Sequence, residues 1–167
     1  MKTISTLILA LAFSVPSLAL TVGKVNAQKV LTTINEGKRV GEKLKKKVEE
    51  KQKILKKEED KFKKMQEDFQ KQTLVMNDKA KAKKQAELQQ AYMKLQQTMG
   101  SFQNEIRDME AKLQAPIVEK IKKVVEKVSK DSGVDITVES RTSPILFAKK
   151  EKDLTEDVIK AYNKEHK

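Results

Sequence analysis

The chain has 167 residues, of which 36% are charged and only 4% aromatic, and its formal net charge is +12. So few bulky side chains exclude a conventional globular core and favour long helices with narrow apolar seams. The positive charge predicts an anionic partner, which could be nucleic acid, membrane headgroups or acidic polypeptide. The sequence contains no cysteine, so disulfide bonds are excluded.

The first 19 residues, MKTISTLILALAFSVPSLA, have the pattern of an export signal. A lysine precedes an apolar run over residues 4–15, and Ser17 and Ala19 place small residues at the −3 and −1 positions of a cleavage site. A transmembrane anchor needs about 20 apolar residues, and this run is shorter. We therefore expect cleavage after Ala19 and a location in the bacterial periplasm.

The segment after this signal begins with a short strand pattern, in which Val22 and Val25 lie on either side of Gly23. Asn26 is suited to cap a following helix, AQKVLTTI. Gly37 is expected to end that helix, because glycine readily adopts the conformation found after helix C-termini.

Two long helical segments follow, over residues 38–76 and 79–131, with the best turn-forming residues at Asn77–Asp78 between them. Large apolar residues of the second segment recur every 3.5 residues on average, which requires a second helix to cover them. This seam consists of Leu88, Tyr92, Leu95, Met99, Phe102, Ile106, Met109 and Leu113. Its simplest partner is the outgoing helix of the same chain. Residues 38–116 should then form an antiparallel hairpin with its tip near 76–79.

The outgoing helix matches this seam poorly, because Lys51 and Glu58 fall in the middle of its own apolar stripe and should loosen the packing. Residues 38–84 hold 18 Lys and Arg against 9 Asp and Glu, whereas residues 85–115 hold 3 against 4. The basic surface therefore belongs to the outgoing helix and the tip. The Phe and Met residues are first of all seam positions, but they also offer adaptable apolar contacts. The candidate contact residues for a partner are Phe62, Met65, Phe69, Met76, Lys79, Lys81, Lys83 and Lys84.

Strand patterns return near the end of the chain. VDITVE over 134–139 and ILFA over 145–148 are expected strands, and Thr155 is expected to cap a last amphipathic helix. Residues 20–37 and 117–167 should therefore form one small strand-bearing body, and Pro116 should mark where the hairpin joins it. The fold class is α+β, mostly α. A sheet of about three strands is unstable with open edges, which predicts self-association.

Catalytic chemistry has little support in the sequence. The single histidine, His166, lies in the C-terminal tail, and Glu58–Glu59–Asp60 lie between lysines on a solvated helix face. The sequence has neither a glycine-rich phosphate loop nor a His/Cys pattern with metal-ligand spacing. We therefore expect neither enzymatic activity nor a cofactor or metal ion.

The signal, the stretch VGKVNAQKVL, the Lys/Gln-rich hairpin and VDITVES…PILFAKKEKDLTEDVIKAYN together resemble the Skp/OmpH family of periplasmic chaperones. The resemblance implies a homotrimer whose strands join in a central β-barrel, with three hairpin arms enclosing a cavity. It also implies that this cavity holds unfolded outer-membrane proteins and prevents their aggregation without ATP. The trimer body would then include Val22, Val25, Ile136, Val138 and Leu146.

The sequence alone does not decide whether the protein binds partners other than unfolded proteins. The lipopolysaccharide site proposed for the family uses paired arginines, whereas the matching stretch here, NEIRDMEAKL, offers Arg107 beside Asp108 and Glu110. Anionic lipid or lipopolysaccharide is a possible partner, and nucleic acid is not expected as a physiological one because the protein is exported. Two alternatives to a holdase are a structural coiled coil of the envelope and a binder of anionic polymers. The first would not prefer unfolded clients, and the second would follow polymer charge with a steep salt dependence.

Overall fold

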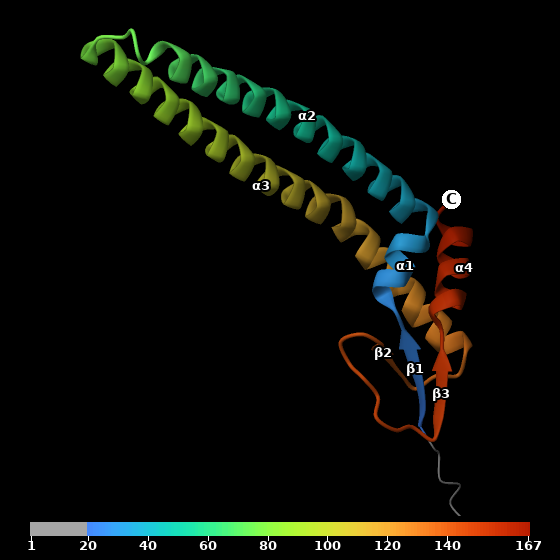
Figure 1. Ribbon diagram of the computed structural model, residues 1–167. Helices are drawn as coiled ribbons and strands as arrows, with labels where there is room; N and C mark the ends of the chain where they lie inside the picture. The colour runs from blue at the N-terminus through green and yellow to red at the C-terminus, as the bar shows by residue number, and fades with distance from the viewer. Residues whose placement is uncertain (1–19) are drawn as a thin grey trace, which may run out of the picture.

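The computed structural model describes residues 20–167 and consists of a small body with one long arm (Figure 1). In chain order the elements are β1 (Thr21–Val25), α1 (Ala27–Thr33), α2 (Asn35–Gln72), α3 (Asp78–Asp131), β2 (Ile136–Glu139), β3 (Lys150–Asp153) and α4 (Thr155–Glu165). The arm consists of α2 and the antiparallel N-terminal part of α3 (Figure 1). The expectation of a mostly helical chain with a small sheet is thus confirmed. The predicted export signal lies outside the described residues.

The sheet has three strands in the order β2-β1-β3, and β1 pairs with both neighbours in parallel. Gly23 lies at its centre, on the face covered by helices. A Cβ atom there would lie 2.8 Å from Cγ1 of Val134 and 2.9 Å from Oγ1 of Thr137. Glycine at this position therefore allows the neighbouring segments to pack directly on β1. The sheet of one chain is open, and the closed barrel of three chains stays a prediction.

The hydrophobic core of the described chain lies in the body. Its buried residues come from β1, α1, the segment between α1 and α2, the C-terminal part of α3, and the region of α4: Val25, Val30, Ile34, Ile117, Ile121, Val124, Val128, Leu154, Val158, Ile159 and Tyr162. Helix α2 contributes no buried residue, and the buried residues of α3 begin at Ile117. Tertiary packing therefore holds the body together, whereas the arm depends on one helix pair.

The first helix does not end at Gly37, as the sequence suggested. Helix α1 ends at Thr33, because Ile34 has an extended backbone with ψ of 150°. Gly37 lies inside the first turn of α2, where a Cβ atom would be 1.7 Å from the carbonyl oxygen of Leu31. The glycine is required there because α2 begins directly against the end of α1.

In the C-terminal part of the body, one expected strand is absent and another starts later than expected. The strand expected over 145–148 is absent, and Lys150–Asp153 pairs with β1 instead. A parallel ladder needs only backbone groups, so a charged edge strand can form it while its side chains stay in solvent. The strand expected over 134–139 is found, but it begins at Ile136.

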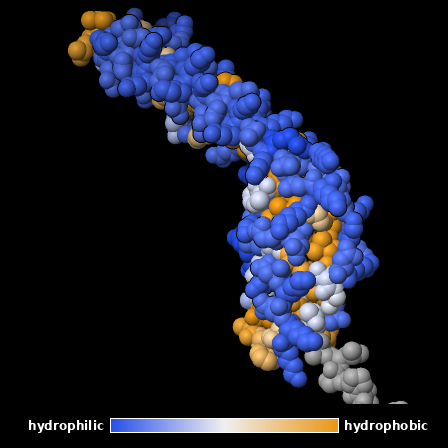
Figure 2. All heavy atoms as spheres, turned by 90° about the vertical axis from the view of Figure 1, so that its right-hand side faces the viewer, coloured by the Kyte–Doolittle hydropathy of each residue, from blue (hydrophilic) through white to orange (hydrophobic). Residues whose placement is uncertain are grey.

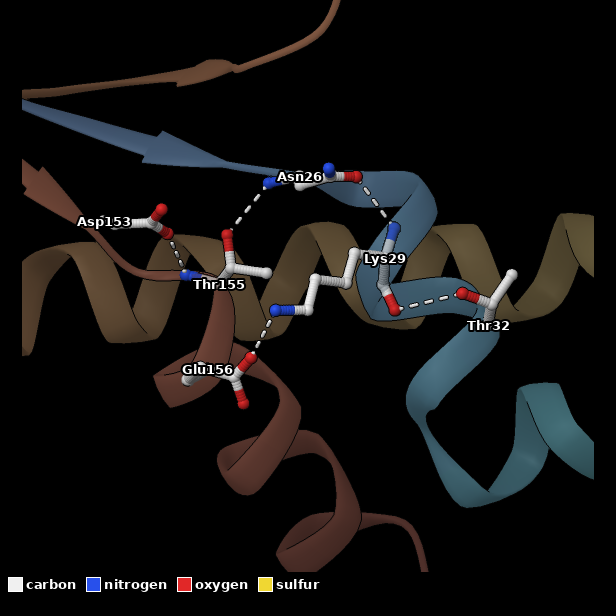
Figure 3. A network of polar contacts seen from close by, with 6 residues as sticks. All are labelled: Asn26, Lys29, Thr32, Asp153, Thr155 and Glu156. Carbon is white, nitrogen blue, oxygen red and sulfur yellow. Dashed lines mark hydrogen bonds and ion pairs between the residues drawn. The ribbon is translucent and has the colours of Figure 1, made fainter.

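Thr155 is the first residue of α4 rather than its cap, and it belongs to a polar network that joins both chain ends (Figure 3). Its hydroxyl accepts a hydrogen bond of 3.0 Å from the backbone N–H of Asn26, and its own N–H donates to Oδ1 of Asp153 at 2.9 Å. Oδ1 of Asn26 accepts from the N–H of Lys29, whose ammonium pairs with Glu156 at 2.7 Å. The buried threonine therefore connects the ends of β1 and β3.

The arm turns slightly earlier than the sequence predicted. Helix α2 ends at Gln72, so Met76 lies in the turn, and Asn77 caps α3 by accepting a hydrogen bond of 2.9 Å from the N–H of Ala80. Helix α3 continues through Gly100 and Pro116 without interruption. Figure 1 shows that it curves where the arm meets the body.

Candidate interaction surfaces

The arm is attached to the body by a cluster at the start of α2. Glu36 accepts hydrogen bonds from the ammonium of Lys120 at 2.8 Å and from the hydroxyl of Tyr162 at 2.6 Å. Oδ1 of Asn163 accepts from the N–H of Asn35 at 2.9 Å. The hydrogen bond from Lys120 lowers the pKa of the Glu36 carboxyl, and burial raises the pKa of Tyr162. Helices α3 and α4 thus fix the direction in which the arm leaves the body.

The predicted seam of α3 faces α2. In the middle of the arm, the contact between the two helices includes a charged side chain. The ammonium of Lys51 lies 4.0 Å from the ring centroid of Phe102 and forms an ion pair with Glu105. The hydrogen bond from Lys51 lowers the pKa of the Glu105 carboxyl. A cation above an aromatic face is attracted by the ring electrons, so this lysine joins the two helices at a position that was expected to loosen their packing.

The apolar residues proposed to contact a partner lie largely between the two helices of the arm. Phe62, Met65 and Phe69 are half-buried on α2, and the ring of Phe62 packs against that of Tyr92 with centroids 5.9 Å apart. Met76 is half-buried in the turn. These side chains are seam residues in the closed arm, and a partner reaches their full surface only when the helices separate.

The lysines proposed to contact a partner gather at the far end of the arm. Lys79, Lys83 and Lys84 are exposed and Lys81 is half-buried. Lys84 forms an ion pair of 3.0 Å with Glu87. The structure thus places these four side chains on the first two turns of α3, close to the turn that contains Met76.

Two residues of the tip were missed in the sequence. Leu74 and Val75 are 89% and 87% exposed in the turn between α2 and α3. Figure 2 shows a hydrophobic patch at this end of an otherwise hydrophilic arm. Both residues had been counted as part of the outgoing helix. The run TLV before a helix-capping asparagine is the signal that could have placed them in the turn, because β-branched residues and an N-cap both favour a break.

The residues expected in a trimer body divide between two environments. Val25 is buried in the core of its own chain, whereas Ile136 is half exposed and Leu146 is almost fully exposed at 97%. Val22 and Val138 are intermediate. Val22 pairs with Ile136 across β1 and β2, so both lie on the sheet face that the helices leave open. Phe147, which the sequence analysis did not select, is 83% exposed beside Leu146.

The body also contains an apolar groove of about 760 Å³ beside β2, between α1 and α3. Leu31 of α1, Val118 and Val125 of α3, and Val134 and Val138 near β2 line it. An exposed apolar segment and an apolar groove therefore occur on the same small body.

Within residues 20–167 no cluster of His, Cys, Asp or Glu has the arrangement of a metal site. No helix in that range combines the length and hydrophobicity that a membrane span requires. The ring of His166 packs on that of Tyr162, with centroids 4.6 Å apart.

The described chain combines a small sheet, a long two-helix arm and an apolar groove on the body. The model of the family described as outer membrane protein (OmpH-like) matches residues 21–162. The chain therefore belongs to the OmpH-like family.

The fold comparison agrees with this assignment. A crystal structure described as that of an OmpH-like outer membrane chaperone from Caulobacter crescentus CB15 is similar, with a TM-score of 0.69 and 14% sequence identity. The match covers 88% of this chain and 85% of the Caulobacter chain. A comparison with curated proteins gives no match.

Proposed function

We propose that this protein is an ATP-independent holdase of the periplasm, which binds unfolded outer-membrane proteins between its arms and prevents their aggregation. The main support for the proposal is the loose packing of the arm. Helix α2 spans 38 residues without one fully buried side chain, so the arm exposes lysines along its length and keeps its apolar side chains half-buried in the seam. Membership of the OmpH-like family and the description of the Caulobacter relative as a chaperone support it. The mechanism requires no cofactor.

Two physical steps account for capture and retention of a client. Lysines of α2 and the tip attract acidic unfolded chains, and charge interactions between exposed groups extend about 8 Å at 0.15 M salt. Apolar side chains of the loosely packed arm then hold the client, because apolar contacts are not screened by salt. Loose Met and Phe contacts do not select one sequence, which suits a protein with many clients.

The test is light scattering of a urea-unfolded outer-membrane protein diluted with and without residues 20–167. Suppression of scattering without ATP is the expected result, and binding of the same client after folding should be much weaker. Changing Lys79, Lys81, Lys83 and Lys84 to Glu should slow capture but barely change release, because steering acts mainly on association. Equal scattering with and without the protein would falsify the proposal.

A binder of anionic polymers is the second candidate, and the excess of lysine on the outgoing helix and tip favours it. That function requires folded and unfolded acidic proteins of equal charge to bind alike, with affinity falling steeply as salt increases. Retention of an unfolded client in 0.5 M salt would exclude it. A structural coiled coil would leave client aggregation unchanged.

We further propose that the holdase is a homotrimer in which the Leu146–Phe147 segment of one copy fills the groove beside β2 of the next. The two apolar surfaces are complementary in chemistry but lie on different parts of the body, so the contact is heterologous. A trimer then requires that the rotation between successive copies closes the ring. Ile136 on the open sheet face would become buried between copies. Changing Ile136 to Asp should therefore reduce the light-scattering mass to that of a monomer.

Cysteine cross-linking tests the contact directly, because the chain has no cysteine of its own. Proteins carrying Val118→Cys and Phe147→Cys should form a disulfide-linked pair when they are refolded together and oxidised. Met93→Cys on the outer surface of the arm is the matched control and should not cross-link to Phe147→Cys. A monomeric wild type with native circular dichroism would overturn the trimer.

The periplasmic location has its own test. Protein recovered from the periplasm of a bacterial host should begin at Leu20, which is the residue after the proposed cleavage site at Ala19.

A further inference from the structure

The methionines of this chain are confined to the arm. Apart from Met1, they occupy positions 65, 76, 93, 99 and 109, all between the start of α2 and Pro116. The core of the body consists of Val, Ile, Leu and Tyr side chains instead. The chain has no cysteine, so the thioethers of the arm are its most readily oxidised groups. A two-electron oxidant should therefore modify the arm and leave the body intact.

Three of these methionines occupy seam positions between α2 and α3. Met65 on α2 and Met109 on α3 are half-buried. Met99 is 37% exposed and lies between Tyr92 and Phe102, whose rings both contact side chains of α2. The adaptable thioether suits a loosely packed seam, but the same looseness leaves the sulfur atoms within reach of small molecules from solvent.

A small cavity beside Met65 provides such access in the closed arm. It has a volume of about 110 Å³ and lies between the two helices, next to Phe69 of α2 and Leu88 of α3. Its other lining residues are polar: Asp68, Gln72 and Lys84. One water molecule needs about 10–15 Å³ of such space, and hydrogen peroxide is only slightly larger than water. A peroxide can therefore approach the thioether of Met65 while the helices remain paired.

We propose that Met65, Met99 and Met109 are sites of reversible oxidation by peroxides, and that their sulfoxides separate the two helices of the arm. The sulfur atom attacks one oxygen of the peroxide, so an S–O bond forms and the O–O bond breaks. The sulfur loses two electrons to the peroxide. The departing hydroxide takes up the proton of the transferred oxygen and leaves as water. The product is methionine sulfoxide, which is polar where the thioether was apolar.

The position of these sulfoxides explains why the helices should separate. A polar S–O group among apolar seam residues loses its hydration unless it finds a donor, whereas separation of the helices returns it to water. Few contacts oppose this movement, because α2 has no buried residue. The body has no methionine in its core and should keep its structure.

One consequence of this inference rests on the proposed function. Separation of the helices would expose the rings of Phe62 and Phe69, which are half-buried in the closed arm. An oxidised holdase should therefore capture unfolded clients more effectively. Separation itself requires no client, so it can be measured on the protein alone.

The experiment treats residues 20–167 with hydrogen peroxide, which leaves lysine amines intact. Mass spectrometry of peptides locates each sulfoxide, and amide hydrogen exchange is compared before and after treatment. Exchange in the arm should become faster by about fivefold or more, while exchange in the body should not change. Treatment with methionine sulfoxide reductases for both sulfoxide epimers should restore the original rates.

Matched variants separate the seam methionines from the others. Changing Met65, Met99 and Met109 together to Leu conserves apolar volume and should abolish the response to peroxide. Changing Met76 in the turn and Met93, which is 61% exposed, to Leu should leave the response intact. Changing the three seam methionines to Gln should speed exchange in the arm without peroxide, because Gln also places a polar group in the seam. Circular dichroism checks that each variant is folded.

Three results would overturn the proposal. The first is exchange that stays unchanged after the seam sulfoxides have formed, and the second is an undiminished response of the triple Leu variant. The third is a seam that remains unmodified when Met93 is fully converted.

The scattering assay of the holdase, run with native and oxidised protein, tests the consequence for clients. Suppression at a lower ratio of oxidised protein to client is expected, and weaker suppression by the oxidised form would refute the gain in capture. Failure of both forms to suppress scattering would refute the holdase, while the exchange measurement would still decide whether oxidation opens the arm.

Discussion

The body and the arm of this protein are stabilised in different ways. All buried hydrophobic residues of the described chain lie in the body, where the sheet, α1, α4 and the end of α3 surround one core. The arm has no buried residue in α2 and is held by half-buried seam positions and polar pairs such as Lys51 with Glu105. A holdase of the proposed kind would benefit from this division, because the arm can deform while the body stays folded.

The largest expected difference in stability comes from truncating an isoleucine in the body and an isoleucine in the arm. Ile117 and Ile106 lie on the same helix, but Ile117 is buried in the core and Ile106 is half-buried in the seam. Ile117→Ala should lower the free energy of unfolding by about 2–5 kcal/mol, because it leaves a cavity that the packed core cannot close. Ile106→Ala should cost about 1 kcal/mol. Urea denaturation at one protein concentration measures the free energy of unfolding of both variants. Equal losses of stability would contradict the difference in packing between body and arm.

Glycine substitutions should act with opposite sign in the two regions. Gly23→Ala places a methyl group 2.8 Å from Val134 in the body and should destabilise it by about 1–3 kcal/mol. Gly100→Ala meets no atom within 4 Å in the arm. It should stabilise α3 by about 0.5–1 kcal/mol, because alanine is the better helix former. Thermal melting followed by circular dichroism distinguishes the two, and a stabilising Gly23→Ala would show that the sheet is less tightly covered than described.

The pH dependence of stability should reveal the cluster that attaches the arm. The lowered pKa of Glu36 means that its contribution is complete above its unfolded pKa of about 4.5, and is lost as the pH falls through the folded value. Glu36→Gln should therefore flatten the loss of stability below that pH. Glu119→Gln, on an exposed part of α3, is the control and should leave the profile unchanged. Denaturation midpoints between pH 3 and 7 provide the measurement.

The smallest effect concerns motion rather than global stability. Amides over residues 50–95 should exchange hydrogen much faster than those of the sheet, since their helices lack a buried core. Lys51→Gln removes the contacts with Phe102 and Glu105 and should speed exchange in the middle of the arm by about two- to fivefold. Exchange in the body should not change. Uniform protection across both regions would indicate a rigid rod instead.

The same division explains what the sequence could predict. The arm follows from local signals: a 3.5-residue repeat from Leu88 to Leu113 and a capping asparagine at position 77, and the structure contains both helices. The body depends on contacts between distant segments, which local patterns do not report. Ile145–Ala148 has better strand residues than Lys150–Asp153, yet the charged segment pairs with β1. Gly37 was taken for a helix end because its close contact with the carbonyl of Leu31 depends on how two helices meet.

The candidate surfaces follow the same rule. Lysines near the tip were identified because charge can be counted along a sequence, and the structure places them together at the start of α3. Leu74 and Val75 were missed because exposure depends on where α2 ends, and that end was placed four residues too late. The groove beside β2 combines residues from α1, α3 and β2, so no single segment of the sequence could have indicated it.

The chain leaves the body at Ile34 and re-enters it at Ile117, and both residues are buried in the same core. The arm is therefore an insertion whose length the body does not constrain. Adding seven residues to α2 and seven to the facing part of α3 would preserve the seam and extend the arm by about 10 Å. In an assembly of several arms, the volume they enclose would grow with each such addition. Capacity for larger cargo could thus evolve by duplication of short helical segments, without any change in the residues that fold the body.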